Sequence, residues 1–187
     1  MRNSRLRFLS VIGTVAVFIG SLWLNEVIFE RSQFVRGVNW VYLPSGVRLL
    51  STLLLGGDGA IGLLMASLLV DFCYFFPHDP VRAFAGGVIG AVAPYAVYRL
   101  ARERYGLHAS LSNLTPKRLL ILAMAYSLAN PLLHHLWFFL EGDTQNFAER
   151  FFAMFVGDLS GALITLYVAK GALSLIPRVP HLRRATR

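Results

Sequence analysis

Residues 8–29 read FLSVIGTVAVFIGSLWLNEVIF, the first of several long apolar runs in this chain of 187 residues. The run is longer than the ~20 residues that an α-helix needs to cross the hydrocarbon core of a bilayer. A cleaved secretion signal has a shorter apolar region, followed by small residues at its cleavage site. Here the end of the run contains Trp23-Leu-Asn-Glu26, which offers no such site. We therefore predict a retained first transmembrane helix.

Five further apolar runs follow, separated by turns and charged segments, at residues 38–55, 60–76, 81–98, 117–140 and 151–173. Each is apolar on all sides, as a lipid-exposed helix requires, and none shows the alternation of a membrane β-strand. Only 15% of the residues are charged, against about 25% in a soluble domain. The sequence predicts an all-α integral membrane protein, a bundle of six transmembrane helices.

The placement of basic residues predicts the orientation of this bundle. Cytoplasmic loops of membrane proteins carry an excess of Lys and Arg. If both termini are cytoplasmic, the outer loops hold few basic residues, namely Arg31, Arg36, Arg82 and Arg150. All the other Lys and Arg residues outside the spans then lie on the inner side. We predict one domain over residues 1–176 with both termini cytoplasmic, followed by a basic cytoplasmic tail over residues 177–187.

Several classes of function are excluded by what the sequence lacks. It has no G-x-S-x-G nucleophile motif, phosphate-binding glycine loop or HExxH zinc motif. Cys73 is the only cysteine, so no thiolate cluster can hold a metal. The net charge of +8 fits basic cytoplasmic loops, because no basic segment alternates with aromatic residues as in a nucleic-acid groove. We predict no enzymatic activity, no metal, no cofactor and no nucleic acid partner.

Three charged residues, Arg48, Asp71 and Asp158, lie within the predicted spans. A charge at the centre of a span costs on the order of 3 kcal/mol. At about 1.5 Å per residue, Arg48 lies ~15 Å and Asp158 ~13 Å below the outer surface. We predict that these two side chains form an ion pair near the midplane. Such a pair can belong to a binding site, or it can simply lock two helices together.

A second group of polar residues is expected nearer the outer surface. Counted from the cytoplasmic face, Asp71 lies at about 17 to 21 Å, His134 at ~26 Å and Glu26 at ~27 Å. Asn130-Pro131 interrupts the backbone hydrogen bonding of the fifth span and frees a carbonyl there. We predict that Asp71, His134, Glu26 and Asn130 line a pocket open to the outside. The alternative for the histidine is a polar anchor at the membrane interface.

Two segments resemble a known family of membrane sensors. Residues 40–50, WVYLPSGVRLL, lead to a glycine-rich turn at 56–59 and resemble the W-x-P-x-G-x-x-L-A…G pattern that opens the MASE-type membrane-associated sensor domain of the first class. Residues 155–164, FVGDLSGALI, are similar to the W-x-G-D-x-x-G-x-L pattern of its last helix. The resemblance covers about residues 35–170, and the positions carried over are Pro44, Gly46, Gly157, Asp158 and Gly161. Arg48 stands where the family usually has a small or apolar residue.

This resemblance implies a sensory or ligand-recognition module of the bacterial inner membrane. Family members are generally fused to cyclase, phosphodiesterase or kinase output domains, and the predicted tail is too short for one. We therefore expect a signal to pass to a separate partner protein, in response to a small ligand from the outer side. Two alternatives stay open. Residues 43–71 also resemble substrate-binding components of energy-coupling-factor vitamin transporters, and a membrane scaffold or assembly factor would use its interior charges for structure alone.

Overall fold

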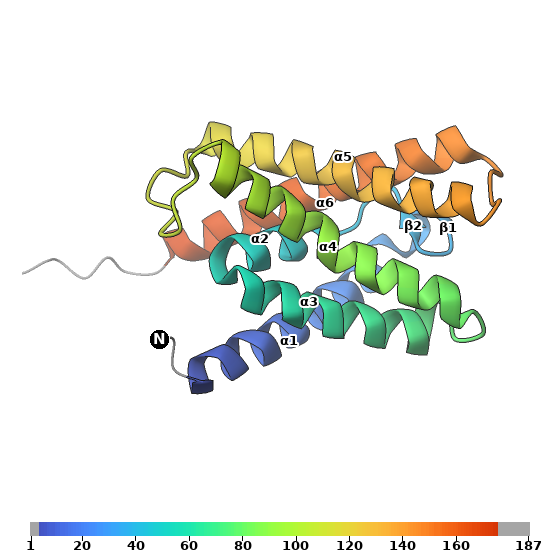
Figure 1. The fold of residues 1–187 in the computed structure, drawn as a ribbon, viewed down its shortest axis with the longest axis horizontal. Coiled ribbons are helices and arrows are strands. Elements are labelled where there is room, and N and C mark those ends of the chain that lie inside the picture. The colour runs from blue at the N-terminus through green and yellow to red at the C-terminus, as the bar shows by residue number, and fades with distance from the viewer. Residues whose placement is uncertain (1–3, 176–187) are drawn as a thin grey trace, which may run out of the picture.

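The computed structural model describes residues 4–175 and, within them, contains six α-helices and one short β-hairpin (Figure 1). The helices are α1 (Ser4–Phe29), α2 (Pro44–Leu55), α3 (Gly57–Val70), α4 (Pro80–Arg104), α5 (Pro116–Leu140) and α6 (Phe147–Ser174). The antiparallel hairpin pairs β1 (Gln33–Val35) with β2 (Val38–Asn39). A 3₁₀ turn at Glu30–Ser32 and a π-helical turn at Asp71–Phe75 complete the described elements.

The predicted bundle of six helices is confirmed, and five of the helices are long and apolar enough to cross a membrane. The remaining helix, α2, has only 12 residues, whereas the sequence predicted a span over the whole of residues 38–55. Pro44 occupies its first turn, where a missing N–H costs no hydrogen bond, and Gly56 ends it at a φ of 61°. The residues before Pro44 form β2 and a non-helical connection. The predicted tail, residues 177–187, lies outside the described residues.

The long helices lie side by side, with α2 in the middle of the bundle (Figure 1). In space α1 packs on α3, α3 on α4, α4 on α5 and α5 on α6, while α2 contacts every other helix. One apolar cluster joins α2, α4 and α5 around Leu49 and Tyr126. A second joins α1, α2 and α3 around Phe18 and Leu63. The short central helix is therefore held by apolar packing against both clusters, through Leu49 and Leu53 in one and Val47 in the other.

The two ends of the bundle differ in what they carry. The hairpin and the loops 76–79 and 141–146 gather at one end, called the hairpin end below (Figure 1). The start of α1, the loop 105–115 and the last described turn of α6 lie at the opposite end. This arrangement puts the predicted outer loops together at the hairpin end. Which side of a membrane that end faces stays a prediction.

The two motif segments lie against each other in the middle of this fold. The backbone N–H of Tyr42 donates to the carbonyl oxygen of Gly157 at 3.1 Å. The hydroxyl of Ser45 donates to the carbonyl oxygen of Asp158 at 2.7 Å. Both contacts join the segment before α2 and its first turn to α6, which is more than a hundred residues later in the chain. The motifs thus form one structural unit.

Two glycines of α6 make this close approach possible. A Cβ atom at Gly157 would overlap the carbonyl oxygen of Asn39, and one at Gly161 would overlap the carbonyl oxygen of Tyr42. Backbone atoms cannot rotate away as a side chain can, so α6 and residues 39–43 would have to separate. The spacing of four residues puts both glycines on one face of the helix.

Asn25 provides a further polar tie, and its removal is expected to destabilise the protein. Its side chain is only 1% exposed, and its Oδ1 accepts a hydrogen bond from the N–H of Leu43 at 2.8 Å. That N–H precedes α2 and has no partner within the helix. We expect Asn25→Ala to lower the free energy of unfolding by about 1–3 kcal/mol, because it leaves this donor buried and unpaired. Thermal unfolding in detergent measures the effect.

Glu26→Gln serves as the control for Asn25→Ala, because the neighbouring side chain is half-buried and accepts a long hydrogen bond, of 3.3 Å, from the hydroxyl of Tyr74. Its unfolding curve should overlay that of the wild type. Equal curves for Asn25→Ala and the wild type would contradict the role assigned to Asn25.

Candidate functional site

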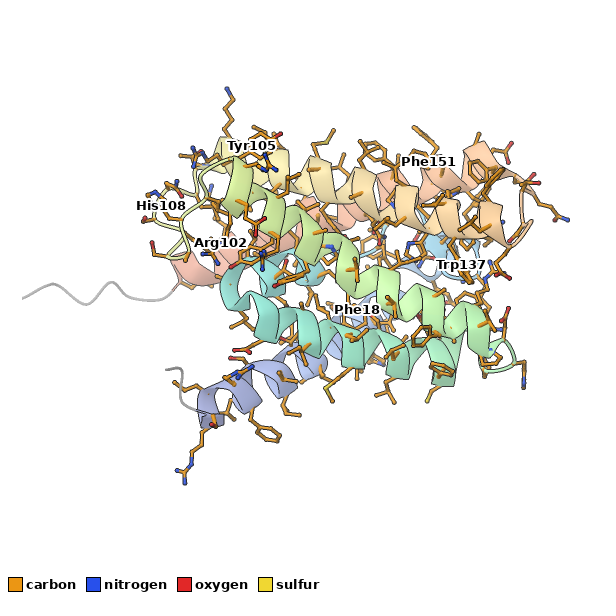
Figure 2. All side chains as sticks on the ribbon, in the orientation of Figure 1. Phe18, Arg102, Tyr105, His108, Trp137 and Phe151 are labelled. Atoms are coloured by element: carbon orange, nitrogen blue, oxygen red, sulfur yellow. The ribbon has the colours of Figure 1, made fainter. Side chains whose placement is uncertain are left out.

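Polar side chains from several helices line one internal cavity of about 70 Å³. It runs from the hairpin end, where Trp137 lies, towards the middle of the bundle, where Phe18 lies (Figure 2). The charged and amide or imidazole side chains in its wall are Arg36, Asn39, Arg48, Asp71, Arg82, Asn130, His134 and Asp158. A space of this size holds a few water molecules or a small polar group, and is far smaller than a pocket for a drug-sized molecule.

Arg48 enters the cavity from α2 and is 7% exposed. Its guanidinium carbon lies 5.2 Å from the ring centre of Phe18 and 5.5 Å from that of Tyr42, within the range of cation–π attraction. Its Nη2 donates to the hydroxyl of Ser67 at 3.4 Å, whereas its Nε has no hydrogen-bond partner within residues 4–175. A Cβ atom at Gly90 would lie 2.7 Å from Nη2, so a larger residue there would displace the guanidinium.

Asp71 enters from the π-helical turn that follows α3 and is 8% exposed. A Cβ atom at Gly86 of α4 would lie 2.9 Å from its Oδ2. Its carboxylate makes no hydrogen bond to another described residue. Short π-helical turns widen a helix by one residue and occur frequently at functional sites. Here the turn places a carboxylate in the cavity wall at the end of a mostly apolar helix.

Asp158 enters from α6 and is 3% exposed. Its Oδ2 accepts a hydrogen bond from Nδ2 of Asn130 on α5 at 2.7 Å. Asn130 itself is 2% exposed, and its Oδ1 has no partner in the part of the chain that the structure describes. The cavity therefore contains an unpaired donor on Arg48 and an unpaired acceptor on Asn130.

The predicted ion pair between Arg48 and Asp158 is not formed. Among the described residues, no ion pair joins them, although both line the cavity. The two side chains reach the cavity from different helices, Arg48 from α2 and Asp158 from α6. The carboxylate bonds to Asn130, and the guanidinium lies on aromatic rings. A depth counted along the sequence predicts how far a side chain lies from the membrane surface, but it does not predict the direction in which the side chain points.

The comparison with protein families identifies the fold. A profile of the MASE1 family matches residues 8–170, which includes the cavity and both motif segments. The chain belongs to the MASE1 family. MASE1 domains are membrane-associated sensory domains and are not catalytic. This confirms the resemblance drawn from residues 40–50 and 155–164 and identifies a multi-pass membrane protein. No curated protein and no solved structure matches the chain.

The motif positions of this MASE1 chain differ in what they do. Pro44 and Gly46 are buried in the first turn of α2, where a Cβ atom at Gly46 would overlap the side chain of Thr165. Gly157 and Gly161 fit the backbone before α2 against α6. These positions are structural. Asp158 differs from the rest, because its carboxylate lines the cavity.

The structure brings most of the predicted site residues of the MASE1 chain together. Those that line the cavity are Arg48, Asp71, Asn130, His134 and Asp158. Glu26 does not, because its carboxylate points to the hydroxyl of Tyr74, 3.3 Å away. The neighbouring Asn25 faces the interior instead. One residue along a helix turns the side chain by about 100°, which a depth estimate does not register.

The predicted interruption of backbone hydrogen bonding at Pro131, which has no N–H to donate, does not break the fifth helix of this MASE1 structure. Helix α5 runs without a break through Pro131. The imidazole of His134 donates from Nδ1 to the carbonyl of Asn130 at 3.0 Å, and that of His135 donates to the carbonyl of Pro131 at 2.8 Å. Proline is tolerated in a transmembrane helix when side chains and neighbouring helices satisfy nearby backbone groups. His134 therefore lines the cavity and also donates a hydrogen bond to the backbone of its own helix.

Sequence reasoning missed the arginines at the mouth of the MASE1 cavity, Arg36 and Arg82. It counted both as outer-loop charges. Arg82 lies over the rings of Phe76 at 4.9 Å and Phe138 at 5.3 Å, and its Nη2 is 3.7 Å from a carboxylate oxygen of Asp143. The sequence does place Arg82 two residues after Pro80, on the first turn of a membrane helix, and this position could have indicated that its side chain reaches the cavity.

Proposed function

We propose that this chain is a sensory module of the bacterial inner membrane that recognises a small ligand or ion in the cavity from the outer side. The observation that carries the proposal concerns two buried atoms of cavity-lining residues, Nε of Arg48 and Oδ1 of Asn130, which have no hydrogen-bond partner among residues 4–175. Buried polar atoms in proteins are almost always hydrogen-bonded. A ligand, or an ion with its bound water, would supply the missing hydrogen-bond partner of each atom. Membership of a sensory family supports the same assignment.

The proposal includes transmission of a signal to a separate partner protein, with both termini on the cytoplasmic side. The cavity wall combines α2, α4, α5 and α6 with the hairpin. A ligand that contacts Arg48 and Asp158 would favour one relative position of α2 and α6. It would shift the protein towards that conformation because it binds that conformation more tightly than the other. Both helices extend towards the end opposite the hairpin (Figure 1). A partner that binds that end would respond to their displacement.

Native mass spectrometry of the protein purified in mild detergent tests this proposal. We expect the wild type to retain a small-molecule or ion adduct. Asp158→Asn should reduce its occupancy at least about tenfold, which corresponds to the loss of one hydrogen bond to a charged group. Glu26→Gln removes a carboxylate outside the cavity wall and should keep the adduct.

Two results would overturn the proposal. One is a wild-type protein that carries no adduct and gains none from a periplasmic extract. The other is equal retention by Asp158→Asn and the wild type. A coupling subunit retained together with ATPases would instead identify the transporter component that residues 43–71 resemble.

A further inference from the structure

A second and larger pocket, of about 480 Å³, opens at the hairpin end next to the cavity. We call it the vestibule. The vestibule and the cavity share four wall residues, Arg36, Phe75, Phe76 and Arg82. The vestibule is also lined by the loops 77–79 and 143–146 and is the more open of the two. The shared wall makes it the way into the cavity from the hairpin end.

Charges of alternating sign follow one face of α4 from the vestibule inwards. Arg82, Gly86 and Gly90 are spaced four residues apart, so each lies about 6 Å deeper than the one before and on the same face. Gly86 faces the carboxylate of Asp71, and Gly90 faces the guanidinium of Arg48. A positive, a negative and a positive group therefore succeed one another along the path.

The innermost charges balance each other. Counted along the helices, Gly90 lies ~15 Å from the start of α4 and Asp158 ~16 Å from the start of α6. Arg48 and Asp158 are thus at one level, with opposite charge and without direct contact. The vestibule is lined by Arg36, Arg82 and Arg150 and by Asp79 and Asp143, so its arginines outnumber its carboxylates, and Asp71 lies deeper, in the cavity wall.

Arg82 is available to a ligand even though it lies near Asp143. The carboxylate of Asp143 is bonded through both oxygens, at 3.0 Å each, to Nη1 of Arg150. Its distance of 3.7 Å to Arg82 is too long for a good hydrogen bond. The Nε of Arg82 has no hydrogen-bond partner among residues 4–175. The Arg82 side chain is 33% exposed and lines the vestibule, so its outer guanidinium nitrogens can bind an anionic group there.

From this geometry we infer that the ligand is a small zwitterion of the amino-acid class. Its anionic group binds Arg82 and Arg36 in the vestibule, and its ammonium group binds Asp71 in the cavity. A simple anion would be repelled by Asp71, and a simple cation by the arginines. A molecule with both groups a few ångströms apart meets an opposite charge at each end. The inference rests on the proposed function and specifies the class of ligand.

A binding panel on the purified full chain in detergent tests the ligand class. The probes are glycine, β-alanine and 4-aminobutyrate, which carry both charges at increasing separation, and butylamine and butyrate, which carry one each. We expect at least one zwitterion to raise the unfolding temperature and to bind in calorimetry, and neither single-charge probe to do so. Asp71→Asn and Arg82→Gln should each weaken that binding at least about tenfold.

Two further variants separate a binding role from a folding role. Arg82→Lys keeps the positive charge and should retain part of the binding. Glu26→Gln should bind like the wild type. Unfolding curves without a probe verify that each variant is folded.

The outcomes distinguish this inference from the proposed function. If butylamine or butyrate binds as well as the zwitterions, the zwitterion class is overturned and a site for a simple ion remains. If no zwitterion binds the wild type, the inference is likewise overturned. The adduct seen by native mass spectrometry then decides the proposed function independently. Undiminished zwitterion binding by folded Asp71→Asn and Arg82→Gln would also overturn the inference, because the site would lie elsewhere.

Discussion

Gly157→Ala is expected to remove most of the folded protein from the membrane. The new Cβ would overlap the carbonyl oxygen of Asn39 and drive residues 39–43 away from α6. Overpacking of this kind costs about 1–3 kcal/mol, and the shift would also break the hydrogen bond from Tyr42 to the carbonyl of Gly157. We expect a total loss of about 3 kcal/mol or more. The yield of monodisperse protein and its thermal unfolding in detergent measure the effect.

Gly171→Ala is the matched control for Gly157→Ala, because it lies on the same helix and a Cβ there would meet no atom within 4 Å. Alanine also has a higher helix propensity than glycine, by about 1 kcal/mol. Gly171→Ala should therefore be as stable as the wild type, or slightly more so. If both substitutions behave alike, the close contact between α6 and the segment before α2 does not stabilise the fold.

Arg48→Ala is expected to have the second large effect. The guanidinium is the positive charge at the depth of Asp158, and it lies about one helical turn deeper in the bundle than Asp71. It fills the space between α4 and the rings of Phe18 and Tyr42. Removing one member of a buried set of charges costs about 3–5 kcal/mol. We expect Arg48→Ala to lower the free energy of unfolding by ~3 kcal/mol. Denaturant unfolding in mixed micelles measures this change.

Arg99→Ala is the control for Arg48→Ala. Arg99 is an exposed arginine on the same helix bundle that pairs with Glu103 within α4. Exposed pairs of this kind contribute at most about 0.5 kcal/mol. A loss for Arg48→Ala as small as the loss for Arg99→Ala would contradict the role of Arg48 in balancing the interior charge.

The double variant Arg48→Ala/Asp158→Asn tests whether the two residues act together. Removing both charges should cost less than the sum of the single losses, with a coupling of about 1–3 kcal/mol. If the double variant regains both stability and its adduct, the two residues only lock α2 to α6. If it stays folded and the adduct is lost, they belong to the site. Strict additivity would mean that each residue acts without the other.

The sequence predicted the helices well and the direction of side chains less well. Long apolar runs determine where helices cross a membrane, because every residue in the run contributes to the signal. The exception is the run 38–55, in which residues 38–43 are not helical and range from buried, as at Val38 and Leu43, to exposed, as at Trp40. Their backbone hydrogen bonds go to Asn25 and α6. A hydropathy pattern contains no information about such long-range partners.

The candidate site was predictable in its composition and not in its pairing. Ionised residues inside a membrane must face the protein interior, so Arg48, Asp71 and Asp158 could be found by their rarity alone. Their partners could not, because a guanidinium can be held by aromatic rings and a carboxylate by an amide. The vestibule was missed because Arg82 stands at the end of a helix, where an arginine is unremarkable in any membrane protein.

The contact between residues 39–43 and α6 also has a consequence for biogenesis. The hydroxyl of Thr165 bonds to the carbonyl of Leu43 across 122 positions of the chain. The second helix therefore leaves the ribosome long before the residues that fix its leading segment exist. Until the last helix is inserted, the polar backbone of that segment lacks its final neighbours. A nascent chain at this stage lacks α6 and therefore Asp158, so the wall of the cavity is complete only after the last helix has been inserted.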